Sequence, residues 1–219
     1  MNAKTKRLTT GAMLAAIAYA VMAVCRIPLM PAAEFLNYDP KDVVIIIGGF
    51  IYGPGMCFML SAVVSLIEMV TVSDTGIIGC IMNILSTCSF ACTAAFIYKK
   101  VHSAKGAVIG LVVGVLLMTL VMILWNYILT PIYRGWPRDM VAEMLLPVFL
   151  PFNLLKGFIN ASLTMLLYKP IVTALRKAHL LETGADHTRV KRRSVGMLLV
   201  GGVILVTCVL VLLAMRGIL

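Results

Sequence analysis

The chain has 219 residues, of which 61% are hydrophobic and only 13% charged, and its formal net charge is +10. Because a water-soluble domain carries about a quarter charged residues, this composition excludes an ordinary soluble globular protein. The charges form clusters between apolar runs long enough to cross about 30 Å of hydrocarbon. The sequence therefore predicts an all-α integral membrane protein.

The apolar runs, taken in chain order, predict six long spans and one short one. The first span, residues 8–27, follows three basic residues and has no evident signal-peptide cleavage site, so we expect it in the mature protein. The short run, residues 43–52, ends at Gly53-Pro54-Gly55, where proline lacks a donor and glycine permits unusual dihedrals, which forces a sharp turn. The remaining spans cover residues 56–72, 76–98, 107–129, 146–167 and 195–215.

The distribution of lysine and arginine predicts the orientation of these spans. With the N-terminus in the cytoplasm, 13 of the 19 basic residues lie in inner segments, five lie in outer segments and Lys156 lies within a span. This predicts a multi-pass protein of the cell membrane with an extracellular C-terminus. The basic residues then meet anionic lipid headgroups, and no nucleic-acid partner is expected. We divide the chain into a six-helix domain at 1–178, a basic cytoplasmic linker at 179–194 and an additional transmembrane helix at 195–219.

Polar residues within the sixth span point to a cavity. Asn153, Lys156 and Asn160 are three and four residues apart and therefore share one helix face. A lysine near the middle of a span costs roughly 3 kcal/mol. Its ammonium group either reaches the headgroups along the helix or lies in a shared polar cavity, and its depth in the span favours the cavity.

Two further asparagines lie at a similar depth. Asn83 and Asn126, like Asn153 and Lys156, fall in the outer halves of their predicted spans. Each asparagine alone is explained equally well by an interhelical hydrogen bond, but together these residues favour a pocket open to the exterior. Amide donors and acceptors with one cation suit a planar ligand edge with carbonyls and ring nitrogens, and they do not suit a metal ion.

The outer segment before the short run adds Phe35, Leu36, Asn37 and Tyr38. These side chains either cover a flat ligand or form an interfacial aromatic belt. Asp39-Pro40 and Asp42 follow directly, and we assign both acids to the start of the next helix, where they would cap it and favour its dipole.

Small residues recur along one face of the first span. Ala12, Ala16 and Ala20 are spaced by four, which permits close approach of another helix, although alanine is also common filler. The sequence contains no GxxxxGK[ST] loop, GxSxG turn or HExxH pair, so no ATPase or hydrolase activity of the usual kind is expected. Active transport by this chain would need energy from a partner or an ion gradient.

Three segments together resemble a known family. They are Phe35-Leu36-Asn37-Tyr38-Asp39-Pro40-Lys41-Asp42, Gly48-Gly49-Phe50-Ile51-Tyr52-Gly53-Pro54 and Phe152-Asn153-Leu154-Leu155-Lys156-Gly157. Over residues 8–175 the sequence is similar to the substrate-binding S component of energy-coupling factor (ECF) transporters. The Asn-x-x-Lys-Gly segment resembles the riboflavin-specific branch.

The resemblance implies a six-helix bundle that binds riboflavin as transported ligand, without a cofactor, and that is not an enzyme. It implies a transmembrane T component and two cytoplasmic ATPases as partners, with release inside after the S component reorients in the membrane. The implied ligand-binding residues are Phe35, Leu36, Asn37, Tyr38, Asn83, Asn126, Asn153 and Lys156. The implied contact with the T component is formed by Ala12, Ala16 and Ala20.

Other readings stay open at this point. The seventh span lies outside the six-helix core of the family, so its role is not implied. An S component for another vitamin is a near alternative, because pocket residues rather than fold set the ligand. A membrane-embedded enzyme would need acid–base groups near an interface, and Glu68, Asp74 and Glu143 are scattered. A purely structural helix-bundle subunit is the remaining alternative.

Overall fold

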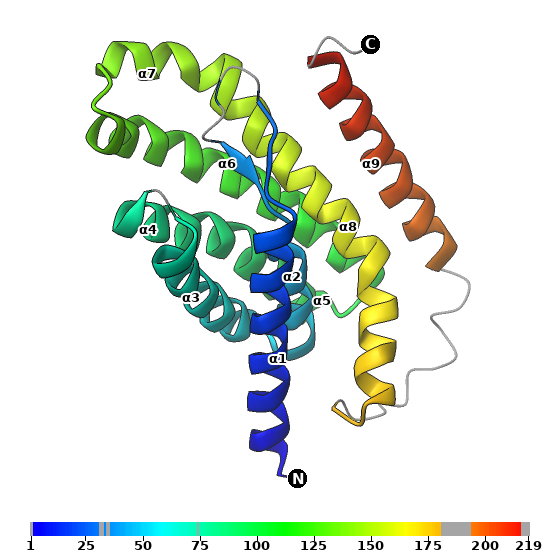
Figure 1. The fold of residues 1–219 in the computed structure, drawn as a ribbon. Coiled ribbons are helices and arrows are strands. Elements are labelled where there is room, and N and C mark those ends of the chain that lie inside the picture. Colours follow the sequence, from blue (N-terminus) through cyan, green and yellow to red (C-terminus); the bar gives the residue numbers. More distant parts are fainter. Residues whose placement is uncertain (1, 31–32, 34–35, 74, 181–193, 216–219) are drawn as a thin grey trace.

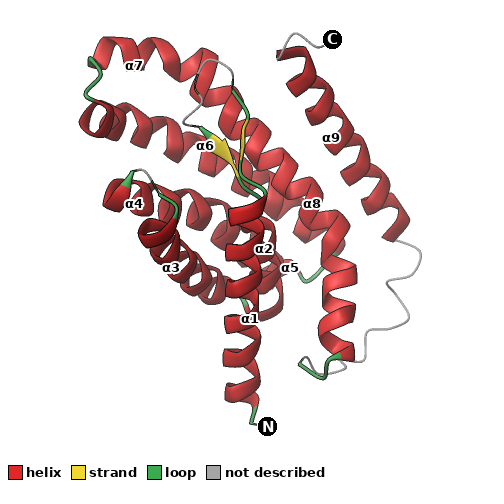
Figure 2. Cartoon of the chain, in the orientation of Figure 1, coloured by secondary structure: helices red, strands yellow, loops and turns green. Residues whose placement is uncertain are grey.

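A computed structural model describes residues 2–30, 33, 36–73, 75–180 and 194–215. These residues form a bundle of helices with one small pair of strands (Figure 1, Figure 2). The all-α prediction is therefore confirmed. The elements are α1 (Ala3–Val24), β1 (Ile27–Pro28), β2 (Asn37–Tyr38), α2 (Lys41–Tyr52), α3 (Pro54–Thr71), α4 (Gly76–Thr87), a π-helical turn (Cys88–Cys92), α5 (Thr93–Val101), α6 (Ala104–Arg134), α7 (Arg138–Met144), a second π-helical turn (Leu145–Phe149), α8 (Leu150–Lys177) and α9 (Ser194–Met215).

Six helical segments among the described residues are long and apolar enough to cross a membrane. They are Lys4–Val24, Pro54–Thr71, Gly76–Val101, Ala104–Arg134, Arg138–Lys177 and Leu198–Met215. Each corresponds to one of the six long runs in the sequence. The segments Ala104–Arg134 and Arg138–Lys177 extend well past the predicted spans 107–129 and 146–167. Polar and aromatic residues continue both helices beyond the apolar runs.

Helix α2 is the short element that the sequence predicted. Its 12 residues rise about 18 Å at 1.5 Å per residue, which is too little to cross the hydrocarbon alone. Its first ten residues, from Lys41 to Phe50, are all buried. The helix contacts α1, α3, α5 and α8, so protein rather than lipid surrounds it, and polar groups on it are tolerated at membrane depth.

A sharp turn joins α2 to α3, as expected from the Gly-Pro-Gly sequence. Gly53 has φ of 91°, a conformation that side chains with a Cβ rarely adopt, and α3 begins at Pro54. Helices α5 and α6 pack with backbones in close approach. A Cβ added to Gly110 would lie 2.8 Å from the carbonyl oxygen of Ala94, so only glycine fits there.

A short antiparallel strand pair follows α1. Ile27 pairs with Tyr38 and Pro28 with Asn37. The chain then enters the bundle at the start of α2, and the buried Tyr38 hydroxyl donates a hydrogen bond of 2.9 Å to Asn160 Oδ1 on α8. The strand pair is thereby tied to α8.

The additional C-terminal helix is present as α9. It packs along α8, its main contact in the described part of the chain, and lies at the edge of the bundle in Figure 1. Most of the predicted linker at 179–194 lies outside the described residues. The division of the chain into 1–178, 179–194 and 195–219 stays a prediction.

Candidate ligand-binding site

A cavity opens at the end of the bundle opposite the N-terminus. Its empty volume is about 830 Å³, counting the open mouth, and it lies where β2, the α3–α4 turn, the end of α6 and the first half of α8 meet. Its polar and charged lining residues are Arg26, Asn37, Asp39, Glu68, Ser73, Thr75, Ser86, Asn83, Asn126, Tyr133, Asn153 and Lys156.

The structure brings most of the predicted site residues to this cavity. Helix α4 supplies Asn83, α6 supplies Asn126, and α8 supplies Asn153 and Lys156. Leu36 and Asn37 line the cavity as well, beside the apolar side chains of Met82, Met122 and Phe152. Their role in ligand binding stays a prediction.

Phe35 and Tyr38 are the remaining predicted residues. Phe35 lies outside the described residues. Tyr38 is not among the residues that line the cavity; it is buried, and its hydroxyl group is bonded to Asn160. Tyr38 therefore anchors β2 to α8 beneath the cavity.

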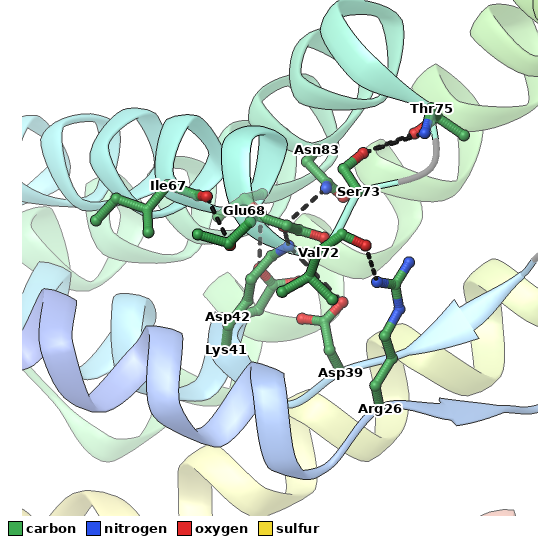
Figure 3. A network of polar contacts seen from close by, with 12 residues as sticks. Arg26, Asp39, Lys41, Asp42, Ile67, Glu68, Val72, Ser73, Thr75 and Asn83 are labelled. Atoms are coloured by element: carbon green, nitrogen blue, oxygen red, sulfur yellow. Dashed lines mark hydrogen bonds and ion pairs between the residues drawn. The ribbon is translucent and has the colours of Figure 1, made fainter.

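A network of buried charges forms the floor of the cavity (Figure 3). Lys41 Nζ lies 2.5 Å from Glu68 Oε2 and 3.7 Å from Asp39 Oδ2. The same Glu68 oxygen accepts a hydrogen bond of 2.9 Å from Asn83 Nδ2. The carboxylate of Glu68 thus fixes both the lysine of α2 and an amide that faces the cavity.

Lys156 joins this network from the opposite side. Its Nζ lies 3.6 Å from Asp39 Oδ2, and only 8% of its side chain is exposed. The alternative in which this ammonium group reaches the headgroups is therefore wrong. Asp39 lies between two lysines, and pairing of this kind is what keeps buried charges from being prohibitively costly.

A second layer of polar contacts lies below the charges. Asp42 accepts hydrogen bonds from Thr87 Oγ1 at 2.7 Å and from Asn160 Nδ2 at 3.4 Å. Together with the bond from Tyr38 to Asn160, these contacts join β2, α2, α4 and α8. The layer fixes the relative positions of the elements that carry the cavity lining.

The N-cap role predicted for Asp39 is wrong. Pro40 occupies the N-cap position of α2, and no side-chain capping hydrogen bond is formed there. Both carboxylates instead take part in tertiary contacts, Asp39 with Lys156 of α8 and Asp42 with Thr87 of α4 and Asn160 of α8. Only the favourable position of Asp42 in the first turn of α2 agrees with the prediction.

The amides of α6 and α8 are oriented by their own helices. Asn126 Nδ2 donates to the Met122 carbonyl oxygen and Asn153 Nδ2 to that of Phe149, each at 2.7 Å. An amide group has two N–H donors and an acceptor oxygen, so each retains hydrogen-bonding capacity toward the cavity. These fixed amides offer both donors and acceptors to a bound molecule.

Sequence reasoning missed Arg26, Asp39 and Glu68 as lining residues. A signal existed for Glu68, since a carboxylate within a predicted span needs a buried partner. Arg26 donates to the Val72 carbonyl oxygen at 3.1 Å and so holds the end of α1 to the end of α3. Among the described residues, no group of three His, Cys, Asp or Glu side chains is placed to hold a metal ion.

The alanine face of α1 lies away from the cavity. Ala12, Ala16 and Ala20 are all exposed, whereas Leu14, Ala15 and Ala18 on the other side of the helix are buried. A strip of small side chains thus remains uncovered on the surface of the described chain. Its role as a partner contact stays a prediction.

Comparison with known proteins gives a consistent result. The family model "ECF transporter, substrate-specific component" matches residues 6–168. The riboflavin transporter FmnP of Bacillus subtilis is 30% identical over 189 residues, which cover 81% of this chain and 99% of that protein. The riboflavin transporter RibU of Staphylococcus aureus is 29% identical and covers 80% of this chain, matched over 94% of its own length.

A solved structure is also similar to this chain. It is the S component of a bacterial ECF transporter, with a TM-score of 0.67 and 30% sequence identity. The match covers 79% of this chain and 99% of that one.

Proposed function

The chain belongs to the family of ECF transporter substrate-specific components, and we propose that it binds riboflavin and mediates its uptake across the membrane. Members of this family are transporter components, so the chain is not an enzyme. The catalytic alternative also lacks support at its candidate residues: Glu143 is exposed, Glu68 is paired with Lys41, and Asp74 lies outside the described residues.

The observation that carries the proposal is the cavity that Asn83, Asn126, Asn153 and Lys156 line together. The isoalloxazine ring of riboflavin is flat, and one edge presents carbonyl oxygens, ring nitrogens and an N–H group. Asparagine amides match such an edge because they donate and accept, and the lysine adds a donor for a carbonyl oxygen. Apolar side chains such as Met82 and Phe152 suit the faces of the ring.

The proposed orientation places the cavity outside the cell. Basic residues of the described chain collect at the opposite end of the bundle, where positively charged segments face the cytoplasm. These residues are Lys4, Lys6, Arg7, Lys99, Lys100, Lys105, Lys169, Arg176 and Lys177. The N-terminus is then cytoplasmic and riboflavin enters from outside, and α9 would return the C-terminus to the outer side.

ATP-driven coupling belongs to the ECF family, and this chain has no ATPase motif of its own. In this proposal the energy comes from two cytoplasmic ATPases through a transmembrane T component. The exposed alanine strip of α1 suits the T component because small side chains let a second helix approach closely. Substrate release inside would follow when the chain reorients in the membrane.

A riboflavin titration tests the proposal. The purified chain should carry yellow flavin or bind it with quenching of flavin fluorescence, and Trp125, next to Asn126 in the sequence, provides a second signal. Thiamine and biotin serve as matched ligands that should neither quench nor compete. Binding of another vitamin in place of riboflavin would support the alternative S-component reading, and the absence of any flavin binding would refute the proposal.

A further inference from the structure

Helix α9 is an addition to the part of the chain shared with the relatives. The family model ends at residue 168, and FmnP is matched over 99% of its length by 81% of this chain. Substrate capture by those proteins therefore needs no counterpart of α9. The position of this helix against the common core indicates what it adds.

One stripe of α9 faces the bundle. Gly201 and Cys208 are buried and Ile204 and Leu212 are partly buried, at spacings of three and four residues. The opposite side carries Leu199, Val203, Val206 and Leu210, which are exposed as expected for a lipid-facing surface. The helix thus has a defined packing face, and that face lies along α8.

The packing face of α9 reaches the wall of the cavity from behind. Cys208 belongs to one apolar cluster with Phe152, Leu155 and Ile159 of α8, and Leu29 and Met30 belong to the same cluster. Phe152 also lines the cavity, and Asn153 and Lys156 on the same helix turn toward it. Helix α8 is therefore held between the cavity on one side and α9 on the other.

We propose that α9 is a positioning helix that holds the cavity-lining face of α8 in place and thereby slows the release of bound substrate. The proposal rests on riboflavin binding by this chain, as argued above. Without α9, the far side of α8 would face lipid, and the wall that carries Asn153 and Lys156 would be fixed only by its inner contacts. When the same ligand binds to closely related sites with different affinity, the difference lies mainly in the dissociation rate.

Two adjacent glycines allow a matched test in the full-length chain. A Cβ on Gly201 would already be in van der Waals contact, 3.4 Å from the Ser162 carbonyl oxygen and 3.5 Å from Met165 Cβ. The three further carbons of Gly201→Leu therefore push α9 away from α8. Gly202 has no atom within 4 Å of an added Cβ, so Gly202→Leu leaves the contact intact. The dissociation rate of riboflavin from each purified protein is measured by stopped-flow recovery of flavin fluorescence.

We expect Gly201→Leu to release riboflavin roughly fivefold or more faster than the wild type, and Gly202→Leu to stay within about twofold. A purely structural role would lower the unfolding temperature of Gly201→Leu and leave its release rate at that of Gly202→Leu. That result would overturn the proposal. If the wild type itself bound no riboflavin, the proposed function would fail instead, so the two failures are distinguishable.

A reversible disulfide between α8 and α9 provides the second measurement, should Gly201→Leu not fold. The 3.5 Å separation of Cβ atoms at Gly201 and Met165 suits a disulfide, so Gly201→Cys with Met165→Cys should tie α9 to α8 under oxidation. The oxidised protein should release riboflavin more slowly than the same protein after reduction. Gly202→Cys with Met165→Cys is the control, in which oxidation should not change the rate. Equal release rates for the oxidised and reduced forms of Gly201→Cys with Met165→Cys would overturn the proposal.

Discussion

Lys156 Nζ of α8 lies 3.6 Å from Asp39 Oδ2, at the entrance of the chain into α2, and both residues line the cavity. The pair joins positions that are far apart in the sequence, and it lies where the ligand is proposed to bind. A second lysine, Lys41, shares the same carboxylate and is also held by Glu68. Ligand binding and bundle stability therefore depend on neighbouring parts of one charge network.

Asp39→Asn should weaken riboflavin binding about tenfold or more, since it leaves the buried Lys156 ammonium without its carboxylate partner. Isothermal titration of riboflavin into the purified variants measures this. Because the two residues form one unit, the double variant Asp39→Asn, Lys156→Met should lose less affinity than the sum of the single variants. Asp139→Asn, at an exposed position of α7, is the control. Additive losses would show that the pair does not act as a unit.

Lys41→Met should destabilise the whole bundle, because it leaves Glu68 buried without its cation. Removal of one partner from a buried ion pair costs about 3–5 kcal/mol. Thermal unfolding in detergent, followed by circular dichroism, should show a lower midpoint, and adding Glu68→Gln should restore part of it. Lys99→Met, at an exposed position of α5, should unfold like the wild type. An unchanged midpoint for Lys41→Met would contradict the stabilising role of the pair.

Asn153→Ala should reduce riboflavin affinity and leave the bundle almost as stable as before. Its side chain bonds within its own helix, to the Phe149 carbonyl oxygen, so the loss of stability should be about 1 kcal/mol. The dissociation constant and the unfolding midpoint are measured on the same preparation, with Thr173→Ala on the exposed side of α8 as control. A variant with normal affinity but altered assembly would instead favour a structural subunit.

Ala16→Trp should separate ligand capture from transport. The residue is exposed on α1 and remote from the cavity, so riboflavin binding by the isolated chain should equal that of the wild type. Uptake of labelled riboflavin by cells that supply the T component and the ATPases should fall at least about tenfold, because the large side chain blocks close helix approach. Val203→Trp, on the lipid-facing side of α9, is the size-matched control. Normal uptake by Ala16→Trp would place the partner contact elsewhere.

Much of the fold follows from the sequence, since the length of the apolar runs and the positions of the charged residues decide which helices cross a membrane. The spacing of Asn153 and Lys156 correctly predicted a shared inward face, because helical geometry alone fixes it. The ends of α6 and α8 were predicted less well. Aromatic and charged residues such as Tyr133 and Arg134 continue a helix past its apolar part, and hydropathy does not register them.

The ion pairs in the charged floor of the cavity could not be predicted from the sequence, for a different reason. Asp39 precedes a proline and a helix, a local pattern that favours a cap. Its actual partners, Lys41 and Lys156, depend on how α2 is buried and on which side of α8 faces it. Local preference competes here with a tertiary ion pair, and only the packed structure reveals which interaction forms.

The burial of α2 also has a consequence for the biogenesis of the protein. This helix is too short to remain alone in the bilayer, and Lys41 and Asp42 would be costly there without partners. Its neighbour α3 follows immediately, but Asn160, which bonds Asp42, is 118 residues further along the chain. During translation α2 must therefore be sheltered by α1 and α3, or by the insertion machinery, until α8 is synthesised. A chain that stops before α8 would leave Asp39 without Lys156 and Asp42 without Asn160, so two carboxylates at membrane depth would each lack a partner.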